Sequence, residues 1–182
     1  SNAVTQQTEA SPVTATPFPA LTLQHQQLAQ ACTTLQGLAT HLARQGSDDA
    51  AMDTARALLR GVPAGMARHC ATEEDGLLPA LMESMAGSDA CCLRDFGRRV
   101  GAEHRALEHL WFALRHPLEC IERGEPAQLC PQDLDAFVAQ CRAHISWAER
   151  ELLPLAVRLL SDAQWAQLAA QAHRRAEPAD RG

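Results

Sequence analysis

The sequence predicts an all-α protein, built as an up-down-up-down four-helix bundle with a short fifth C-terminal helix. Ala and Leu dominate the 182 residues, of which 46% are hydrophobic and 4% aromatic, and Tyr is absent. Few residues are β-branched, so the composition favours helix over strand. Four segments repeat apolar residues at alternating spacings of four and three, the pattern of the buried seam of a bundle helix. Glycine-containing turns separate these segments, at 45–49, 86–89 and 123–126.

The four long helices are expected at about 20–44, 48–84, 89–122 and 132–159. Gly61 and Pro63 should bend the second helix near its middle. Pro79 and Pro154 lie late in the second and fourth helices, and each is expected to kink or end its helix.

The fifth helix should begin at Ser161, because Ser161-Asp162-Ala163-Gln164 has the sequence of a capping box. Together with Trp165 and Leu168 on an apolar side, this predicts a helix over 161–176 and a frayed tail at 177–182.

The chain length fits one domain with tails, and the bundle would occupy 20–160. Residues 1–19 are expected to form a disordered arm rich in Thr, Gln and Pro. The arm begins with Ser1-Asn2-Ala3, which has the sequence of a cloning scar and is left out of the fold.

Four histidines take equivalent positions around the three turns. His25 and His69 are equidistant from Ser47, and His104 and His144 are equidistant from Gly124. His69 and His104 are likewise centred on the second turn. Residues equidistant from a turn lie level in antiparallel helices, so all four should share one layer. Imidazole is the commonest metal ligand among side chains, and bundle cores hold such sites on facing helices. The layer therefore predicts a metal centre inside the bundle.

Carboxylates follow two of these histidines at helical spacing. Glu73 lies four residues after His69, and Glu108 four after His104, so each pair shares a helix face, about 6 Å apart along the axis. Burying such groups without partners would cost several kcal/mol, and a bound cation would compensate them directly.

The second and fourth helices also resemble each other. Each has a histidine, His69 or His144, ten residues before a proline, with Leu-Leu just ahead of the proline. In the fourth helix the nearest following carboxylate is Glu149.

These motifs resemble the hemerythrin-like, or HHE cation-binding, family over about residues 20–175. The most specific stretches are HCATEEDGLLPAL in the second helix and HISWAERELLPLA in the fourth. The family is a four-helix bundle with a histidine on helix 1, H-x-x-x-E on helix 2, a histidine on helix 3 and a His–carboxylate pair on helix 4. The resemblance implies a non-haem di-iron centre, onto whose ligands five residues map directly: His25, His69, Glu73, His104 and His144.

Two positions depart from the family pattern. Many relatives place the helix 4 carboxylate four residues after the histidine, where this chain has Ala148, and Glu149 follows instead. Oxygen-carrying hemerythrins have a second helix 3 histidine where this chain has Glu108. With Glu108 and Glu149 included, the implied shell has four histidines and three carboxylates, which favours the ferric state over reversible oxygen carriage. Glu74 and Asp75 are expected to face outward or to orient a ligand from outside the shell.

The resemblance leaves three functions open. The first is binding or sensing of O2, NO, peroxide or iron itself at two non-haem irons, with zinc as a substitute metal. The second is a di-iron oxidoreductase, or an iron–sulfur cluster repair protein, that acts on NO or peroxide. The third is a helical interaction module that holds a single metal or none.

Net charge and cysteine content indicate which partners and which cellular compartment to expect. The net charge is −6 and the pI about 5.7, which gives no basic footprint for nucleic acid and no polybasic membrane patch. No stretch reaches the roughly 18 apolar residues of a membrane span, and no secretory signal is visible. Seven cysteines without a C-x-x-C pair indicate reduced thiols in a cytoplasmic protein. The expected partner is a small diatomic ligand or peroxide, and a homodimer or an unknown protein partner is left open.

Overall fold

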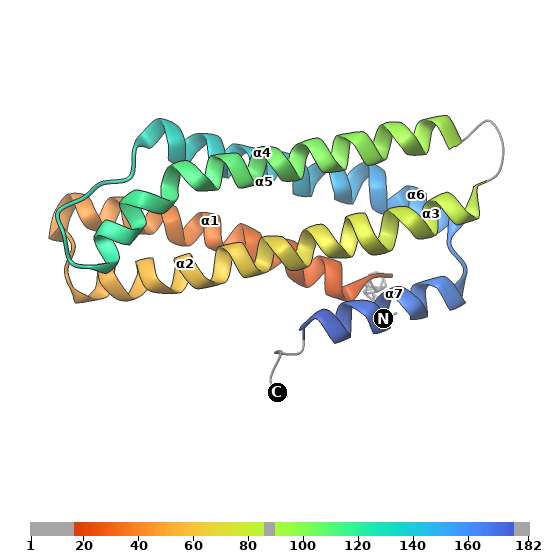
Figure 1. Cartoon of the computed structure of the whole chain (residues 1–182), viewed down its shortest axis with the longest axis horizontal. Coiled ribbons are helices and arrows are strands. Elements are labelled where there is room, and N and C mark those ends of the chain that lie inside the picture. The colour runs from red at the N-terminus through yellow and green to blue at the C-terminus, as the bar shows by residue number, and fades with distance from the viewer. Residues whose placement is uncertain (1–16, 86–89, 177–182) are drawn as a thin grey trace, which may run out of the picture.

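The computed structural model describes residues 17–85 and 90–176, and the regular elements in these ranges are helices (Figure 1). The predicted all-α class is confirmed. The elements, with η for a π-helical segment, are α1 (Pro19–Gln45), α2 (Asp49–Cys70), η1 (Ala71–Leu77), α3 (Leu78–Ser84), α4 (Ala90–Glu122), α5 (Pro131–Trp147), η2 (Ala148–Leu152), α6 (Leu153–Leu159) and α7 (Asp162–Ala176).

Four long columns alternate in direction, as the sequence predicts (Figure 1). They are formed by α1, by α2–η1–α3, by α4, and by α5–η2–α6. Helix α7 returns along one end of the bundle, where it contacts η1, α1 and α2. Residues 1–16 of the arm expected at 1–19, the second turn at 86–89 and the tail at 177–182 lie outside the described residues. At the end of that expected arm, Phe18 is 1% exposed and α1 begins at Pro19.

The helix ends follow from local sequence. Asp48 caps α2 by accepting a hydrogen bond from the Ala51 amide at 2.9 Å. Gly46 ends α1 and has a φ of 66°, a conformation that glycine adopts without steric cost. The predicted capping box is present at α7, where Gln164 accepts from the Ser161 amide at 2.9 Å and Ser161 Oγ accepts from the Gln164 amide at 3.3 Å.

The second and fourth columns do not end at their prolines. Pro79 and Pro154 lie in the first turns of α3 and α6, and each column passes into these helices through a π-helical segment. Proline cannot donate a backbone hydrogen bond, and the wider π turn just before it accommodates that loss. Single π turns inside helices are frequent at functional sites, and both of these follow a histidine of the predicted layer. Pro63 lies inside the continuous helix α2.

The buried hydrophobic residues form two clusters, and the four histidines separate them along every column. One cluster includes Leu28 of α1 and Leu107 of α4, and the other includes Leu21 and Val100 of the same helices. His25 lies between Leu21 and Leu28 in sequence, and the histidine of α4 lies between Val100 and Leu107. The layer is therefore a polar plane enclosed by apolar packing on both sides.

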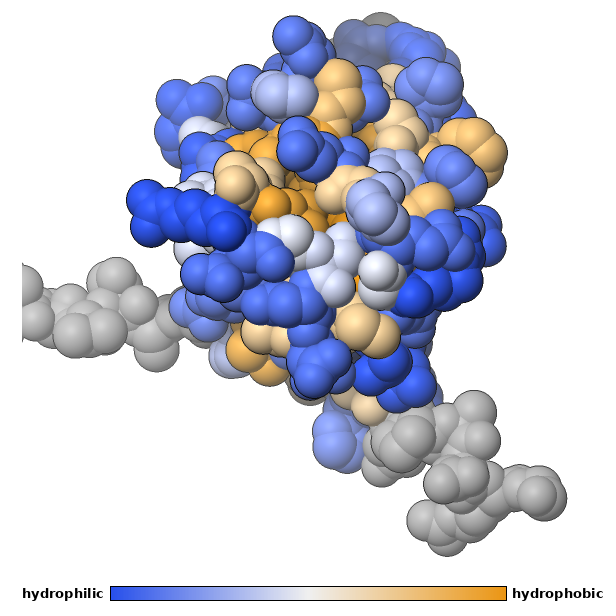
Figure 2. Space-filling model, turned by 90° about the vertical axis from the view of Figure 1, so that its left-hand side faces the viewer, coloured by the Kyte–Doolittle hydropathy of each residue, from blue (hydrophilic) through white to orange (hydrophobic). Residues whose placement is uncertain are grey.

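The end of the bundle formed by the first and third turns is mostly hydrophilic around a small hydrophobic centre (Figure 2). Gly124 of the third turn has a φ of 74°.

Among the described residues, no helix combines the length and apolar character needed to cross a membrane.

Candidate metal centre

One histidine from each column enters the core at the same level. His25 comes from α1, His69 from α2, His104 from α4 and His144 from α5, and none is more than 3% exposed. Neighbouring ring centroids lie 4.9 Å apart for His104 and His144 and 5.1 Å apart for His69 and either His25 or His144. The histidine layer that the sequence predicts is thus formed.

Glu73 lies at the centre of this layer and is fully buried. Its Oε2 is 2.9 Å from His104 Nε2 and 3.1 Å from His144 Nε2. Its Oε1 is 3.3 Å from His69 Nε2 and 3.6 Å from His25 Nε2. Each oxygen of one carboxylate therefore faces the Nε2 atoms of two histidines.

Carboxylates outside the layer form hydrogen bonds with the Nδ1 atoms of two histidines, on the side of each ring that faces away from Glu73. His104 Nδ1 is 2.9 Å from Glu74 Oε2, and His144 Nδ1 is 2.6 Å from Glu103 Oε2. A carboxylate on Nδ1 fixes the ring orientation and keeps the proton there, so Nε2 presents its lone pair toward the layer. The expectation that Glu74 could orient a ligand agrees with this contact, whereas Glu103 was not singled out from the sequence.

The remaining two histidines differ from each other at Nδ1. His25 Nδ1 lies 3.3 Å from Glu149 Oε1, whose side chain is 50% exposed. Glu149 thus contacts a histidine from outside the layer. His69 Nδ1 is buried and has no hydrogen-bond partner among the described residues.

Glu108 is placed away from the four histidines. It is exposed on α4, beside Trp111 and Phe112, and lines a separate surface hollow. The inward residues of α4 after His104 are Leu107 and Trp111, three and seven positions on, so a residue four positions on turns outward. The structure therefore brings together five of the seven residues implied by the resemblance, places Glu149 at the rim, and leaves Glu108 outside.

Glu103 and Cys70 are the residues that sequence reasoning did not assign to the site. Glu103 directly precedes His104 but contacts the histidine of a different helix, so no spacing within one helix could reveal it. Cys70, Glu74 and His104 offer donor atoms within 4.8 Å of one another at the edge of the layer. Cys70 is next to His69 in sequence, and its nearness to His104 is visible only once α2 and α4 are packed.

The central carboxylate is held in its ionised form, and the imidazoles around it differ in how readily they carry a proton. Burial raises the pKa of Glu73, but the neighbouring imidazoles, His69 foremost, outweigh burial and hold that pKa well below its usual range. Burial lowers the pKa of His104, but hydrogen bonds with Cys70, Glu73 and Glu74 outweigh it and raise the pKa to about 11. Burial is the largest effect on His69 and lowers its pKa to about 3.

These groups fit a bound cation. The Nε2 atoms of His69 and His144 lie 2.9 Å apart, and His25 Nε2 and Glu73 Oε1 are buried without a hydrogen-bond partner among the described residues. Donor atoms of His25, His69, Glu73 and His144 all lie within 4.8 Å of one another. Imidazole nitrogens with a carboxylate suit iron or zinc, and a shared cation satisfies the buried donor atoms that face each other here.

A helical bundle with a buried His–Glu cluster at mid-height defines the class: a metal-binding four-helix bundle protein. The model of the hemerythrin HHE cation binding domain matches residues 16–156. The chain belongs to this hemerythrin HHE cation-binding family. Neither a curated protein nor a solved structure gives a significant match.

Proposed function

We propose that the cluster binds two non-haem iron ions with Glu73 as the bridging carboxylate. The observation that supports this most directly is the division of the layer by that side chain. Oε1 faces His25 and His69, whereas Oε2 faces His104 and His144. A carboxylate that presents each oxygen to a separate pair of imidazoles is suited to link two metal ions.

The residues of the site would have two roles: some would bind the metals, and others would orient the metal-binding histidines. The four Nε2 atoms and Glu73 would hold the metals, and Glu74, Glu103 and Glu149 would keep the protons of three histidines on Nδ1. When bound, a pair of irons supplies a centre that binds and exchanges electrons with a small ligand. The apolar clusters on both sides of the layer exclude bulk water from it.

The role that we propose is binding or sensing of O2, NO or peroxide, in the cytoplasm. The family match supports cation binding, and the six cysteines whose side chains are described are free thiols. Reaction with NO or peroxide, as an oxidoreductase or cluster-repair protein would perform it, would use the same centre and differ by turnover.

A single metal ion is the second candidate, and one observation favours it. The donor atoms of His25, His69, Glu73 and His144 form a group within 4.8 Å, and His104 is not part of that group. Three histidines and one carboxylate make a four-coordinate set that zinc accepts readily.

Metal content tests these candidates. The full chain is expressed with added iron and measured by plasma mass spectrometry together with its near-ultraviolet and visible spectrum. Two irons per chain with oxo-bridge absorption in the ferric form support the proposal, and addition of NO or peroxide then distinguishes stoichiometric binding from turnover. One zinc per chain, or no metal, would overturn the di-iron proposal. Glu73→Gln, which keeps the side-chain shape, is the matched variant and should lose the metal.

A further inference from the structure

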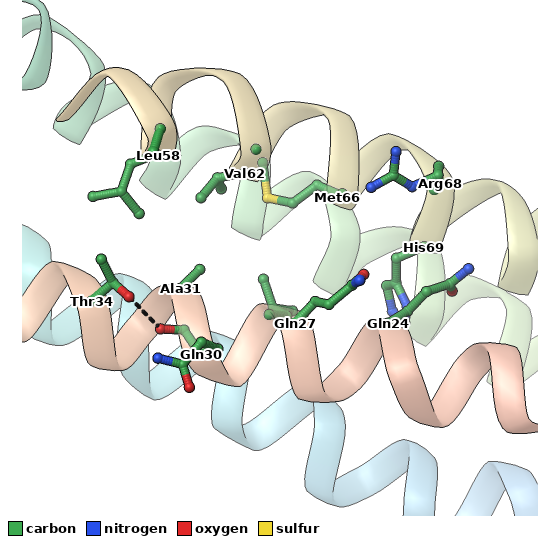
Figure 3. A pocket seen from close by; sticks show the side chains of 14 residues that line it. Gln24, Gln27, Gln30, Ala31, Thr34, Leu58, Val62, Met66, Arg68 and His69 are labelled. Carbon is green, nitrogen blue, oxygen red and sulfur yellow. Dashed lines mark hydrogen bonds between the residues drawn. The ribbon is translucent and has the colours of Figure 1, made fainter. Parts of the chain in front are cut away.

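A groove runs along the bundle between α1 and α2 and ends at the metal layer (Figure 3). It has a volume of about 350 Å³, within the range of small-molecule sites. Its walls are mainly apolar and include Leu28 from α1 and Leu58, Val62 and Met66 from α2. At its inner end the His69 ring projects between the two helices beside Gln24.

Glycines keep this groove open. Gly61 and Gly65 of α2 both line it, one helical turn apart. A Cβ added at either position would meet nothing within 4 Å. The space is therefore produced by missing side chains and would be filled by larger ones.

The inner end of the groove carries unsatisfied polar groups. His69 is 3% exposed and its Nδ1 has no hydrogen-bond partner among the described residues. Gln24 donates from Nε2 to Thr72 Oγ1 at 3.0 Å. The Oε1 atom of Gln24 is buried and has no hydrogen-bond partner among the described residues. Arg68 also lines the groove, and among the residues that the structure describes its guanidinium forms no ion pair.

Among the four histidines, His69 differs in having no hydrogen-bond partner at Nδ1 among the described residues. The other three indicate which chemical group a partner of this atom should carry. If Nε2 binds metal, as the proposed function requires, Nδ1 must carry the proton and act as a donor. The other three histidines meet a carboxylate oxygen at Nδ1, from Glu149, Glu74 and Glu103. The His69 ring lines the inner end of the groove, and no carboxylate of the described residues forms a hydrogen bond with its buried Nδ1.

We propose that the groove binds a small organic carboxylate with an unbranched apolar chain. The carboxylate would accept the hydrogen bond of His69 Nδ1 and pair with Arg68, and the chain would lie along Val62 and Met66. Bound in this way, the ligand completes the set of carboxylates around the histidine layer. The metal centre would then respond to the ligand, because a carboxylate on the outer nitrogen of a metal-bound imidazole raises its basicity.

The charge and the walls together favour this ligand over a water molecule or a diatomic gas. A water could pair with His69, but it would leave the apolar walls and the Arg68 charge without a partner. A diatomic molecule would fill a small part of about 350 Å³. A carboxylate with a hydrocarbon chain matches both the cationic end and the apolar length.

Calorimetric titration of octanoate into the iron-loaded full chain tests the proposal. We expect saturable binding of one octanoate per chain, and weaker binding of octan-1-ol, which lacks the charge. Gly65→Leu should fill the groove and weaken octanoate binding roughly tenfold or more. Gly37→Leu is the matched control, since Gly37 is an exposed helical glycine with equally open surroundings outside the groove, and it should bind octanoate like the unaltered chain.

Arg68→Gln removes the charge at the inner end and should weaken octanoate binding roughly threefold or more, with little effect on octan-1-ol. Arg60→Gln removes the same charge from an exposed position of α2 outside the groove and should change neither. Absence of octanoate binding, or binding that neither Gly65→Leu nor Arg68→Gln weakens, would overturn the proposal.

Metal content measured on the same samples keeps the two proposals apart. Octanoate binding by a chain that takes up no iron would support the groove as a carboxylate site and overturn the di-iron proposal, together with the link between groove and metal that rests on it. Iron binding with no octanoate binding would support the function and overturn the groove.

Discussion

The second and fourth columns of the bundle carry nearly the same motif but contribute differently to the site. Each has a layer histidine, a π-helical segment soon after it, and a Leu-Leu-Pro sequence whose proline lies ten residues after the histidine. In the second column the residue four after the histidine is Glu73, which is fully buried between all four imidazoles. In the fourth column the equivalent residue is Ala148, equally buried, and Glu149 beside it is half exposed.

This difference shows that one position decides whether a carboxylate enters the layer. The residue four after the histidine points to the core in both columns, whereas the residue five after it points to the rim. Glu149 therefore contacts the Nδ1 atom of His25, and among the described residues Glu73 is the single carboxylate at the centre. The site is richer in imidazole than the sequence resemblance implies.

The largest effect should come from replacing Glu73, and the comparison is with the same replacement of Glu149. Glu73→Gln removes the charge that faces four imidazoles, so the protein should lose its metal entirely. Its melting temperature should fall to that of the metal-free protein, because metal binding adds to folding stability. Glu149→Gln removes a rim carboxylate and should retain the metal stoichiometry. Metal analysis and thermal unfolding of both variants measure this. Equal losses in the two variants would show that the columns contribute equally.

Ala148→Glu would make the fourth column match the second. A second carboxylate would then enter a closely packed position, and without metal the variant should lose about 1–3 kcal/mol of stability or more from overpacking and buried charge. With iron present, the added oxygen ligand should recover much of that loss and shift the absorption spectrum. Thermal unfolding with and without iron measures the difference. A variant that stays equally destabilised in iron would show that position 148 does not face the metal.

The rim carboxylates should have an intermediate effect. Glu103→Gln replaces the charged acceptor 2.6 Å from His144 Nδ1 with a neutral amide, and the loss of this charge should lower metal affinity roughly 10–100-fold. Glu108→Gln on the same helix is the control and should leave affinity unchanged, because Glu108 is exposed and outside the layer. Competition with a chelator measures both affinities. A loss of affinity in Glu108→Gln would restore Glu108 as a ligand.

The smallest effect should be a pH dependence of the chelated protein. The pKa of His104 is raised to about 11 in the folded state, so its stabilising contribution is complete below the ordinary pKa of 6.5 and is lost as pH rises toward 11. His69, with its pKa lowered to about 3, stays neutral above pH 6.5 and adds no slope there. The melting-temperature advantage of the chelated protein over His104→Gln should shrink by several degrees from about pH 6 to about pH 10. An advantage that grows with pH would contradict this assignment.

Much of the site could be predicted because a helix converts spacing into position. The distances of His25, His69, His104 and His144 from the turns placed them in one layer, and the spacing of Glu73 from His69 placed it on the same face. Glu108 has the same spacing from His104, yet α4 is α-helical throughout and turns it outward. The second column passes into a π-helical segment that contains Glu73, and such a change of helical pitch leaves no clear mark in the sequence.

By itself, the sequence determined the helical class, the order and turns of the columns, the capping of α7 and the depth of the four histidines. These properties depend on composition, periodicity and local hydrogen bonds. Only the tertiary structure decided which carboxylates hold which imidazoles, because Glu103, Glu74 and Glu149 each act on a histidine of another helix. It also decided that His69, alone of the four histidines, finds no such partner among the described residues and lines the groove, since that depends on how α1 and α2 pack beside the two glycines of α2.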